Sequence, residues 1–156
     1  MTTHQGMEIL LVEDNPRDAE LALRALEASH PTTRVTWLKD GAEALACFFG
    51  ADGAPAPARS FPTVILLDLK LPKVDGLEVL RQIKSDPRTQ VIPVVMLTSS
   101  REESDLVRSY RLGANSFIVK PVDCDKYEEA LTQLGLYWLR FNQTPAVAPA
   151  LAGEPR

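Results

Sequence analysis

The sequence is short of several features that mark whole classes of protein. Its 156 residues include only two cysteines, Cys47 and Cys124, too few for a disulfide framework and suited to a reducing compartment. No apolar run approaches the length of a membrane span, and the opening MTTHQGMEIL lacks the pattern of a secretory signal. We therefore expect a cytoplasmic protein with no membrane partner.

Positive charge is also scarce. Seventeen Lys and Arg against 21 Asp and Glu give a net charge of -4, and the basic residues form no clustered stripe. Because nucleic-acid surfaces are normally rich in clustered Lys and Arg, we expect no nucleic-acid partner. The 45% hydrophobic and 24% charged composition is that of one globular domain with a core of its own.

The chain alternates between short apolar runs and segments with helical spacing of apolar residues. The runs predict strands over residues 7–14, 34–38, 63–69, 92–99 and 116–120. The periodic segments predict helices over residues 15–28, 42–49, 76–86, 103–112 and 123–141, with Asn15 and Asp123 as caps. This alternation predicts an α/β fold with a doubly wound parallel sheet and helices on both faces. Residues 1–6 and 142–156 are expected to be disordered, which leaves a domain over residues 7–141.

Acidic, hydroxyl and basic side chains stand where four of these strands end. Glu13 and Asp14 follow the first strand, Asp68 the third, Thr98 the fourth and Lys120 the fifth. Carboxyl ends of parallel strands meet at one edge of the sheet, where ligands bind. Three crowded carboxylates repel one another unless a cation joins them, and oxygen ligands with open water positions suit Mg2+. Lys120 adds a second positive charge, so the missing partner is an anion with several oxygens, such as a phosphoryl group.

Four segments of the chain, in order, resemble the receiver domain of two-component response regulators, of which the chemotaxis response regulator is the minimal member. They are LLVEDN, LLDLKLPKVDG, VVMLTSS and GANSFIVKPV. The resemblance covers about Met7 to Phe141. It implies a flavodoxin-like fold, with five parallel strands in the order 2-1-3-4-5 and five helices.

The resemblance also implies which residues react and which bind metal. Asp68 is the expected phospho-acceptor. Asp14, Asp68 and the backbone carbonyl of Lys70 are expected to bind Mg2+, with Glu13 acting through water.

Further roles are implied for residues at the ends of the fourth and fifth strands. Thr98 is expected to hydrogen-bond the phosphoryl group, and Lys120 to pair with it. Phe117 is the expected aromatic switch, moving inward as Thr98 is drawn toward the phosphate. Pro121 is expected to follow a cis peptide bond that helps to aim Lys120.

Three other segments resemble, more closely, the response regulators of phytochrome-type histidine kinases. They are EDNPRDAEL, IKSDPRTQVIPVVMLTSS and YWLRFNQTP, and the long loop Gly50–Pro62 fits the same subgroup. The expected function is that of a single-domain response regulator and not of an enzyme. It would accept a phosphoryl group from such a kinase on Asp68, with Mg2+, and signal through protein contacts. A receiver-like adaptor that works without phosphorylation is the alternative.

Two rival functions are disfavoured by single positions. An Asp-nucleophile phosphatase of the haloacid dehalogenase type needs a second Asp two residues after the first, where this chain has Lys70. A nucleotide- or flavin-binding protein of this topology needs a Gly-rich loop after the first strand. The sequence EDNPRD places carboxylates there instead, and these would repel phosphates.

The last expected helix carries more apolar surface than one sheet face would cover. Its heptad-like seam consists of Tyr127, Leu131, Leu134, Trp138 and Phe141, and Leu136 and Leu139 lie off that seam. Such a surface predicts a homodimer through the fourth and fifth helices and the C-terminal extension. The alternative is that the helix packs on its own sheet. Gly135 is expected to mark a bend, because glycine weakens a helix interior.

Overall fold

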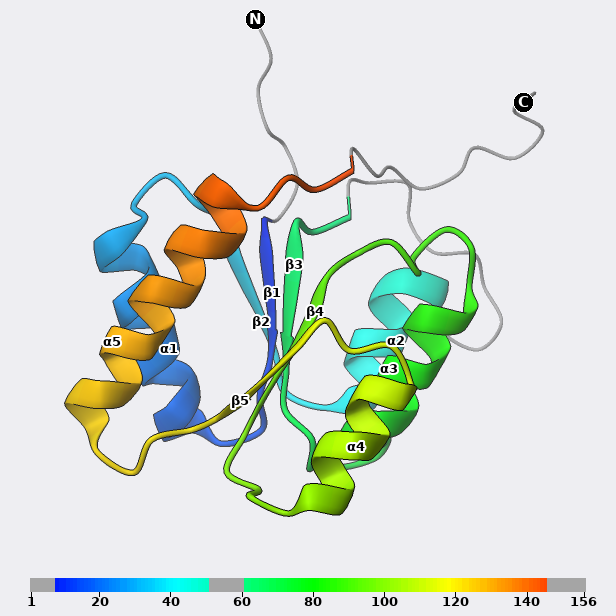
Figure 1. The fold of residues 1–156 in the computed structure, drawn as a ribbon. Helices are drawn as coiled ribbons and strands as arrows, with labels where there is room; N and C mark the ends of the chain where they lie inside the picture. The colour runs from blue at the N-terminus through cyan, green and yellow to red at the C-terminus, as the bar shows by residue number, and fades with distance from the viewer. Residues whose placement is uncertain (1–7, 51–60, 146–156) are drawn as a thin grey trace, which may run out of the picture.

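A parallel sheet of five strands forms the centre of the molecule (Figure 1). The computed structural model describes residues 8–50 and 61–145, so the expectations for residues 1–6, for most of the Gly50–Pro62 loop and for residues 146–156 lie outside the described residues. The strands are β1 Ile9–Val12, β2 Val35–Leu38, β3 Val64–Leu67, β4 Val94–Thr98 and β5 Ser116–Val119. Their order, β2-β1-β3-β4-β5, is the expected one.

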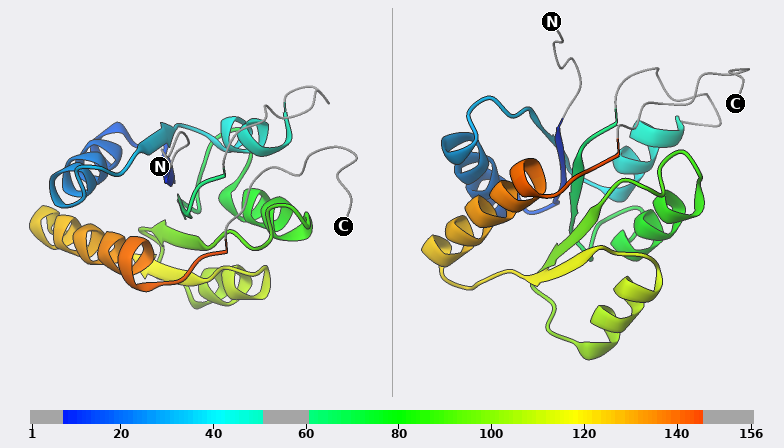
Figure 2. Two further views of the ribbon diagram at one scale, coloured as in Figure 1. Left: turned by 90° about the horizontal axis from the view of Figure 1, so that it is seen from above. Right: turned by 45° about the horizontal axis from the view of Figure 1, so that its top comes forward.

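Helices cover both faces of the sheet, as the doubly wound prediction requires. They are α1 Pro16–Ser29, α2 Gly41–Phe49, α3 Gly76–Ser85, α4 Glu103–Arg111 and α5 Cys124–Leu136. The views in Figure 2 show α1 and α5 on one face and α2, α3 and α4 on the other. Within the described ranges, no helix combines the length and the apolar character needed to cross a bilayer.

Two helices begin directly after the residues expected to cap them. The Asn15 side chain accepts hydrogen bonds from the backbone N–H groups of Arg17 and Asp18, and Pro16 occupies the first helical position of α1. The Asp123 side chain accepts from the first turn of α5 in the same way. These caps satisfy backbone donors that have no partner inside the helix, so they fix where α1 and α5 start, next to the strand ends.

The central strands are apolar on both sides because both sides are covered. Leu10 and Ile65 belong to the hydrophobic cluster under α2, α3 and α4, whereas Ile9 and Val64 belong to the cluster under α1 and α5. Every residue of β1, β3 and β4 is buried. The edge strand β5 is half-buried at all four positions, so its apolar side chains are partly exposed.

Most of the seam on the last helix belongs to the protein's own core, so only the end of this helix is left for the predicted interface. Tyr127, Leu131 and Leu134 are buried in the cluster that α5 shares with α1 and the sheet. The physical reason is that α5 lies beside α1, so the stripe faces inward between helix and sheet. The apolar side chains left exposed at this end are Leu136, Tyr137 and Phe141, at 44%, 50% and 68%.

Gly135 has a packing role where a bend was expected. The α-helix continues through Gly135 and changes to a π-helical turn only at Tyr137–Phe141. A Cβ atom at Gly135 would lie 2.6 Å from Nε2 of His30, the buried residue that ends α1. A side chain at this position would therefore collide with the His30 imidazole, and glycine lets α1 and α5 pack closely here.

Candidate functional site

The expected site residues come together at one edge of the sheet. Glu13 and Asp14 follow β1, Asp68 follows β3, and Thr98 ends β4, which are adjacent strands. Glu13, Asp68 and Thr98 are buried, and Asp14 is exposed. Two ionisable groups are thus held out of water at the end of rigid strands, which is costly unless charged partners compensate them.

Lys120 supplies that compensation. Its Nζ lies 2.6 Å from Oε1 of Glu13, 2.9 Å from Oδ2 of Asp18 and 3.2 Å from Oδ2 of Asp68. The lysine reaches the acids from the end of β5, where its backbone N–H donates to the Thr98 carbonyl at 2.7 Å. An ammonium group has three donors, and here a different carboxylate accepts each of them.

The charges at this site shift one another's protonation. Burial, with the Asp68 carboxylate close by, raises the pKa of Glu13 to about 7, although Lys120 opposes the shift. Burial would lower the pKa of Lys120, but the Asp68 and Glu13 carboxylates outweigh it and raise that pKa. Lys120 therefore stays charged, and one ammonium is too little positive charge for the acids around it.

A divalent cation fits the remaining negative charge. Carboxylate oxygens of Glu13, Asp14 and Asp68 all lie within 4.8 Å of one another. Opposite oxygen ligands of an octahedral Mg2+ are about 4.2 Å apart, so small side-chain movements bring these acids to coordination distance. An all-oxygen set in which one acid is exposed also leaves room for the waters that Mg2+ retains.

The hydroxyl and aromatic residues expected at the site are near the strand ends. The Thr98 side chain is buried, and its Oγ1 accepts a hydrogen bond from the backbone N–H of Ser100 at 3.2 Å. Ser100 in turn donates to Asp105 in α4 at 2.6 Å. Phe117 of β5 is half-buried and packs against the core under α2, α3 and α4. Thr98 is therefore linked through the β4–α4 loop to α4.

The loop after Asp68 is folded tightly over the strand end. Oδ1 of Asp68 accepts from the N–H of Leu69 at 2.7 Å, and the N–H of Gly76 donates to the Leu69 carbonyl at 2.8 Å. A Cβ at Gly76 would lie 2.1 Å from the Asp68 carbonyl oxygen, so only glycine fits. Lys73 has a φ of 70°, a conformation that is strained for a residue with a side chain. The loop that carries Lys70 is thereby held against the site.

The expectation of a cis peptide bond before Pro121 is wrong. The described residues contain no cis peptide bond, so the Lys120–Pro121 bond is trans. The trans form is the lower-energy isomer of an X–Pro bond by about 0.5–1 kcal/mol, and Lys120 reaches all three acids with it.

Two residues of the site were not found from the sequence. Asp18 shares Lys120, and the Trp37 indole donates to the Glu13 carbonyl at 2.7 Å. The available signal for Asp18 is its place in the first turn of α1, four residues after Asp14 of the acidic pair. Trp37 carries no such signal, because its contact depends on the pairing of β2 with β1.

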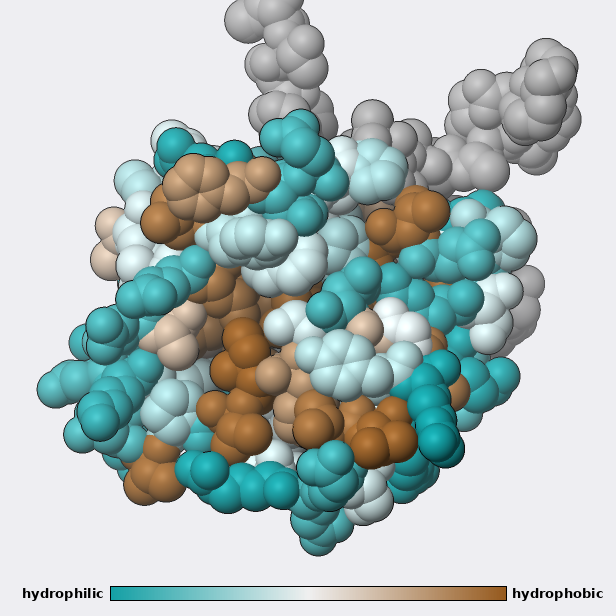
Figure 3. Space-filling view, in the orientation of Figure 1, coloured by the Kyte–Doolittle hydropathy of each residue, from teal (hydrophilic) through white to brown (hydrophobic). Residues whose placement is uncertain are grey.

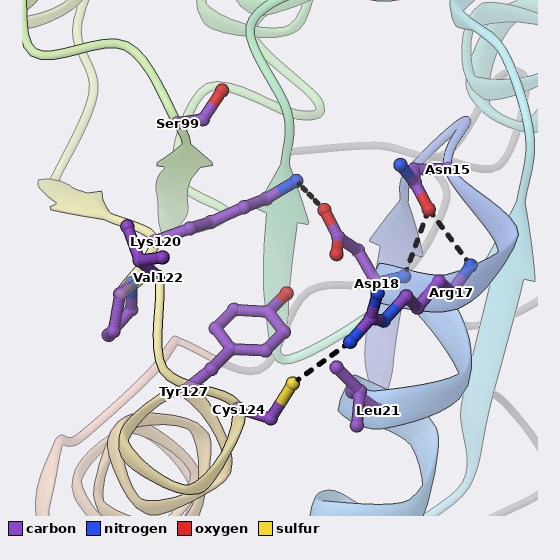
Figure 4. A pocket seen from close by; sticks show the side chains of 10 residues that line it. Asn15, Arg17, Asp18, Leu21, Ser99, Lys120, Val122, Cys124 and Tyr127 are labelled. Atoms are coloured by element: carbon purple, nitrogen blue, oxygen red, sulfur yellow. Dashed lines mark hydrogen bonds and ion pairs between the residues drawn. The ribbon is translucent and has the colours of Figure 1, made fainter.

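A pocket of about 310 Å³ opens beside the acids, between the start of α1 and the β5–α5 loop. Figure 4 shows Lys120 extending across it to Asp18, and Arg17 reaching Sγ of Cys124 at 3.4 Å. The Tyr127 hydroxyl, also on its wall, is buried and has no hydrogen-bond partner. Burial raises the pKa of this hydroxyl, so it stays protonated as a potential donor.

An acid cluster and a lysine at the carboxyl edge of a 2-1-3-4-5 sheet define a phosphoryl-accepting signalling domain. The sequence pattern of the family described as "Response regulator receiver domain" matches residues 9–132. The chain belongs to that family.

Two curated relatives match over nearly their whole length. The probable methanogenesis regulatory protein FilR2 of Methanothrix harundinacea is 44% identical over 140 residues, covering 90% of this chain and 88% of its own. Response regulator Rcp1 of Synechocystis is 38% identical over 138 residues, covering 88% and 92%.

Solved structures give the same picture. The Mn2+-bound form of Rcp1 superimposes with a TM-score of 0.81 at 37% identity, over 90% of this chain and all of the other. The phosphorylated cyanobacterial phytochrome response regulator RcpA has a TM-score of 0.80 at 38% identity, over 92% and 99%. The bacteriophytochrome response regulator AtBRR is 52% identical, with a TM-score of 0.65, over 88% and 98%. This chain thus has the fold of these response-regulator receivers, one of which was solved with Mn2+ bound.

Proposed function

We propose that this protein accepts a phosphoryl group on Asp68 from a histidine kinase and signals through protein contacts. The observation that supports the proposal is the environment of Asp68: its carboxylate is buried, lies within 4.8 Å of two other acids and accepts a hydrogen bond from Lys120. A structural acid would need only the lysine. A carboxylate with both a cation site and a lysine can attack an anionic phosphoryl group.

In the proposed transfer, a carboxylate oxygen of Asp68 attacks the phosphorus of a phosphohistidine. The P–O bond forms as the P–N bond breaks, and the leaving imidazole nitrogen keeps the electron pair. Catalysis of this kind is mostly positioning and charge neutralisation. Lys120 neutralises part of the transferred charge, and its hydrogen bond to Glu13 holds it in place.

The Mg2+ that we propose for this site would be held by Asp14, Asp68 and the Lys70 carbonyl, with Glu13 acting through water. When bound, it supplies positive charge to the phosphoryl oxygens. Asp14, the exposed acid, marks the side from which solvent reaches the cluster.

Thr98 and Phe117 are the residues we propose for signalling. The Thr98 hydroxyl would turn from its bond with the Ser100 N–H to a phosphoryl oxygen, and Phe117, half-buried on the neighbouring strand, would move into the space released. Because Ser100 is bonded to Asp105, this change would reach α4.

We propose that the donor is a histidine kinase of the phytochrome type. The transfer would take place in the cytoplasm, where ATP is available to phosphorylate the kinase. Two structural neighbours, RcpA and AtBRR, are described as phytochrome response regulators, and AtBRR is 52% identical to this chain. We propose that the receiver domain spans residues 7–141, slightly more than the 9–132 that match the family.

The first test is phosphorylation of wild type and Asp68→Asn, with acetyl phosphate and with an autophosphorylated phytochrome kinase as donors. We expect a single Mg2+-dependent phosphoryl group on the wild type, read by intact mass, and none on the variant, because an amide is not a nucleophile here. Near-ultraviolet circular dichroism will show whether the variant is folded.

Either of two results would contradict the proposal. Equal labelling of Asp68→Asn would show that the acceptor is elsewhere. A folded wild type that takes no phosphoryl group from either donor would favour the adaptor that works without phosphorylation.

The surface through which we propose signalling is the side of the molecule carrying α4, β5 and the end of α5. Figure 3 shows apolar side chains gathered in front of β5, between α5 and α4. Exposed apolar residues flank this strand, Tyr110 on α4 and Val122 after β5, at 50% and 93%. We propose that a second copy of the chain covers this surface together with Tyr137 and Phe141, which forms a homodimer.

A further inference from the structure

Asp18 is an acid that the proposed chemistry does not require. Its Oδ2 lies 2.9 Å from Nζ of Lys120, closer than Oδ2 of Asp68 at 3.2 Å. Among the described residues, the acids whose oxygens could share one cation are Glu13, Asp14 and Asp68, and Asp18 is not one of them. The negative charge of Asp18 is therefore directed at the lysine and not at the metal position.

Local structure keeps Asp18 in this place. It lies in the first turn of α1, where its backbone N–H donates to Oδ1 of the Asn15 cap at 3.2 Å. A carboxylate there is also stabilised by the positive end of the helix dipole. Because Pro16 and Asn15 fix the start of α1, the Asp18 side chain is presented to Lys120 by a rigid turn.

Asp18 is also the most accessible of the three acids around Lys120. Its side chain is 29% exposed, against 9% for Asp68 and 2% for Glu13. It stands on the wall of the 310 Å³ pocket beside the site, with Lys120 across from it (Figure 4). Asp18 thus holds one donor of the lysine on the solvent side, away from the buried acids.

A phosphoryl group on Asp68 would compete with Asp18 for the hydrogen-bond donors and the positive charge of Lys120. It adds negative charge and oxygen acceptors where Oδ2 of Asp68 now accepts a hydrogen bond from Lys120 at 3.2 Å. A hydrogen-bond donor of Lys120 that is bonded to Asp18 is not available to the phosphoryl group. The Asp18 carboxylate also repels that group. For a cation at the metal position the same negative charge is favourable.

We propose that Asp18 is a positioning residue that competes with the aspartyl phosphate for Lys120 and thereby limits how tightly the phosphoryl group is held. The proposal rests on the proposed function of Asp68. Its consequence is opposite for the two ligands of the site: Asp18 weakens the binding of the phosphoryl group and strengthens the binding of Mg2+.

The test uses Asp18→Asn in the full chain, because asparagine keeps the shape and an oxygen acceptor for Lys120 but removes the charge. At saturating Mg2+, the phosphoryl analogue beryllofluoride is expected to bind about three- to tenfold more tightly than in wild type. The aspartyl phosphate is expected to hydrolyse more slowly by a similar factor. With no analogue present, calorimetry should show Mg2+ binding weakened by about two- to fivefold.

Two controls separate this effect from general damage or net charge. Asp18→Glu restores the carboxylate and is expected to return all three quantities toward wild type. Glu20→Gln removes the same charge from an exposed position of α1 and should change none of them more than about twofold.

Opposite signs for the analogue and for Mg2+ would support the proposal. Weaker binding of both ligands to Asp18→Asn would overturn it, since that is the result of a structural role, and so would no change in either. A wild type that binds Mg2+ but neither beryllofluoride nor a phosphoryl group would overturn the proposed function first, and this inference with it.

Discussion

At the residue scale, the positive charge of Lys120 is shared among three acids, Glu13, Asp18 and Asp68. Glu13, whose side chain is only 2% exposed, has the shortest contact with Lys120 and a pKa raised to about 7. The cause is burial, with Asp68 adding to it. The metal-free protein therefore pays a free-energy cost to keep Glu13 ionised at neutral pH.

This cost predicts a pH dependence of stability in the metal-free protein. The pKa of Glu13 rises from 4.5 in the unfolded chain to about 7 in the folded protein, so the folded state binds more protons between these values. The stability due to this shift is complete below pH 4.5 and is lost as pH rises through about 7. Over that range the loss is on the order of 2–3 kcal/mol.

Urea unfolding of wild type and Glu13→Gln in EDTA will measure this pH dependence of stability. Glutamine cannot ionise, so the variant should match the wild type near pH 5 and exceed its free energy of unfolding at pH 8. A difference between the two proteins that is constant from pH 5 to pH 8 would show that Glu13 is not the titrating group.

At the scale of elements, the packing of α1 against α5 positions the residues at the starts of both helices beside the site. These helices carry Asn15, Asp18 and Cys124 at their starts, beside the pocket, and pack together at the other end where His30 meets Gly135. His30 is buried, and its Nε2 lies 3.4 Å from the Thr132 carbonyl. Any group added at Gly135 must displace the imidazole.

We expect Gly135→Ala to destabilise the fold by about 1–3 kcal/mol, the usual cost of overpacking. Helix propensity alone predicts the opposite, a gain of about 0.5–1 kcal/mol from replacing glycine by alanine. Thermal and urea unfolding of Gly135→Ala, His30→Ala and the double variant will separate the two effects. In the His30→Ala background the penalty should shrink or reverse; an equal penalty there would mean that His30 is not the obstacle.

At the scale of the whole molecule, one side remains partly uncovered. Helices α1 and α5 close one face of the sheet and α2, α3 and α4 the other, but the edge strand β5 has half-buried residues between α4 and α5 (Figures 1 and 3). The π-helical turn Tyr137–Phe141 extends the same side with exposed aromatic rings. Burial of this surface against a second copy is the physical basis of the proposed dimer.

Light scattering during size-exclusion chromatography should show a dimer in the high micromolar range. Phe141→Asp is expected to weaken dimerisation at least tenfold, because Phe141 is 68% exposed and its ring would be buried in the contact. Val91→Asp is the matched control, since Val91 is 46% exposed on the loop before β4. A monomeric wild type, with and without phosphorylation, would exclude the dimer.

The order of the elements, the caps of α1 and α5, and the placement at the strand ends of the five residues expected at the site could all be predicted from the sequence. These follow from local signals: apolar periodicity, an Asn–Pro pair, and acids placed directly after buried strands.

Which charged groups contact one another could not be predicted in this way, because it depends on the folded arrangement of distant elements. The pairing of Asp18 with Lys120 joins residues 102 apart in the chain, and the Trp37 contact depends on strand pairing. The seam of α5 likewise has an apolar pattern that fits either a core or an interface. Most of it is buried in the core because α1 packs beside α5. Such contacts depend on packing between distant elements, which no local pattern records.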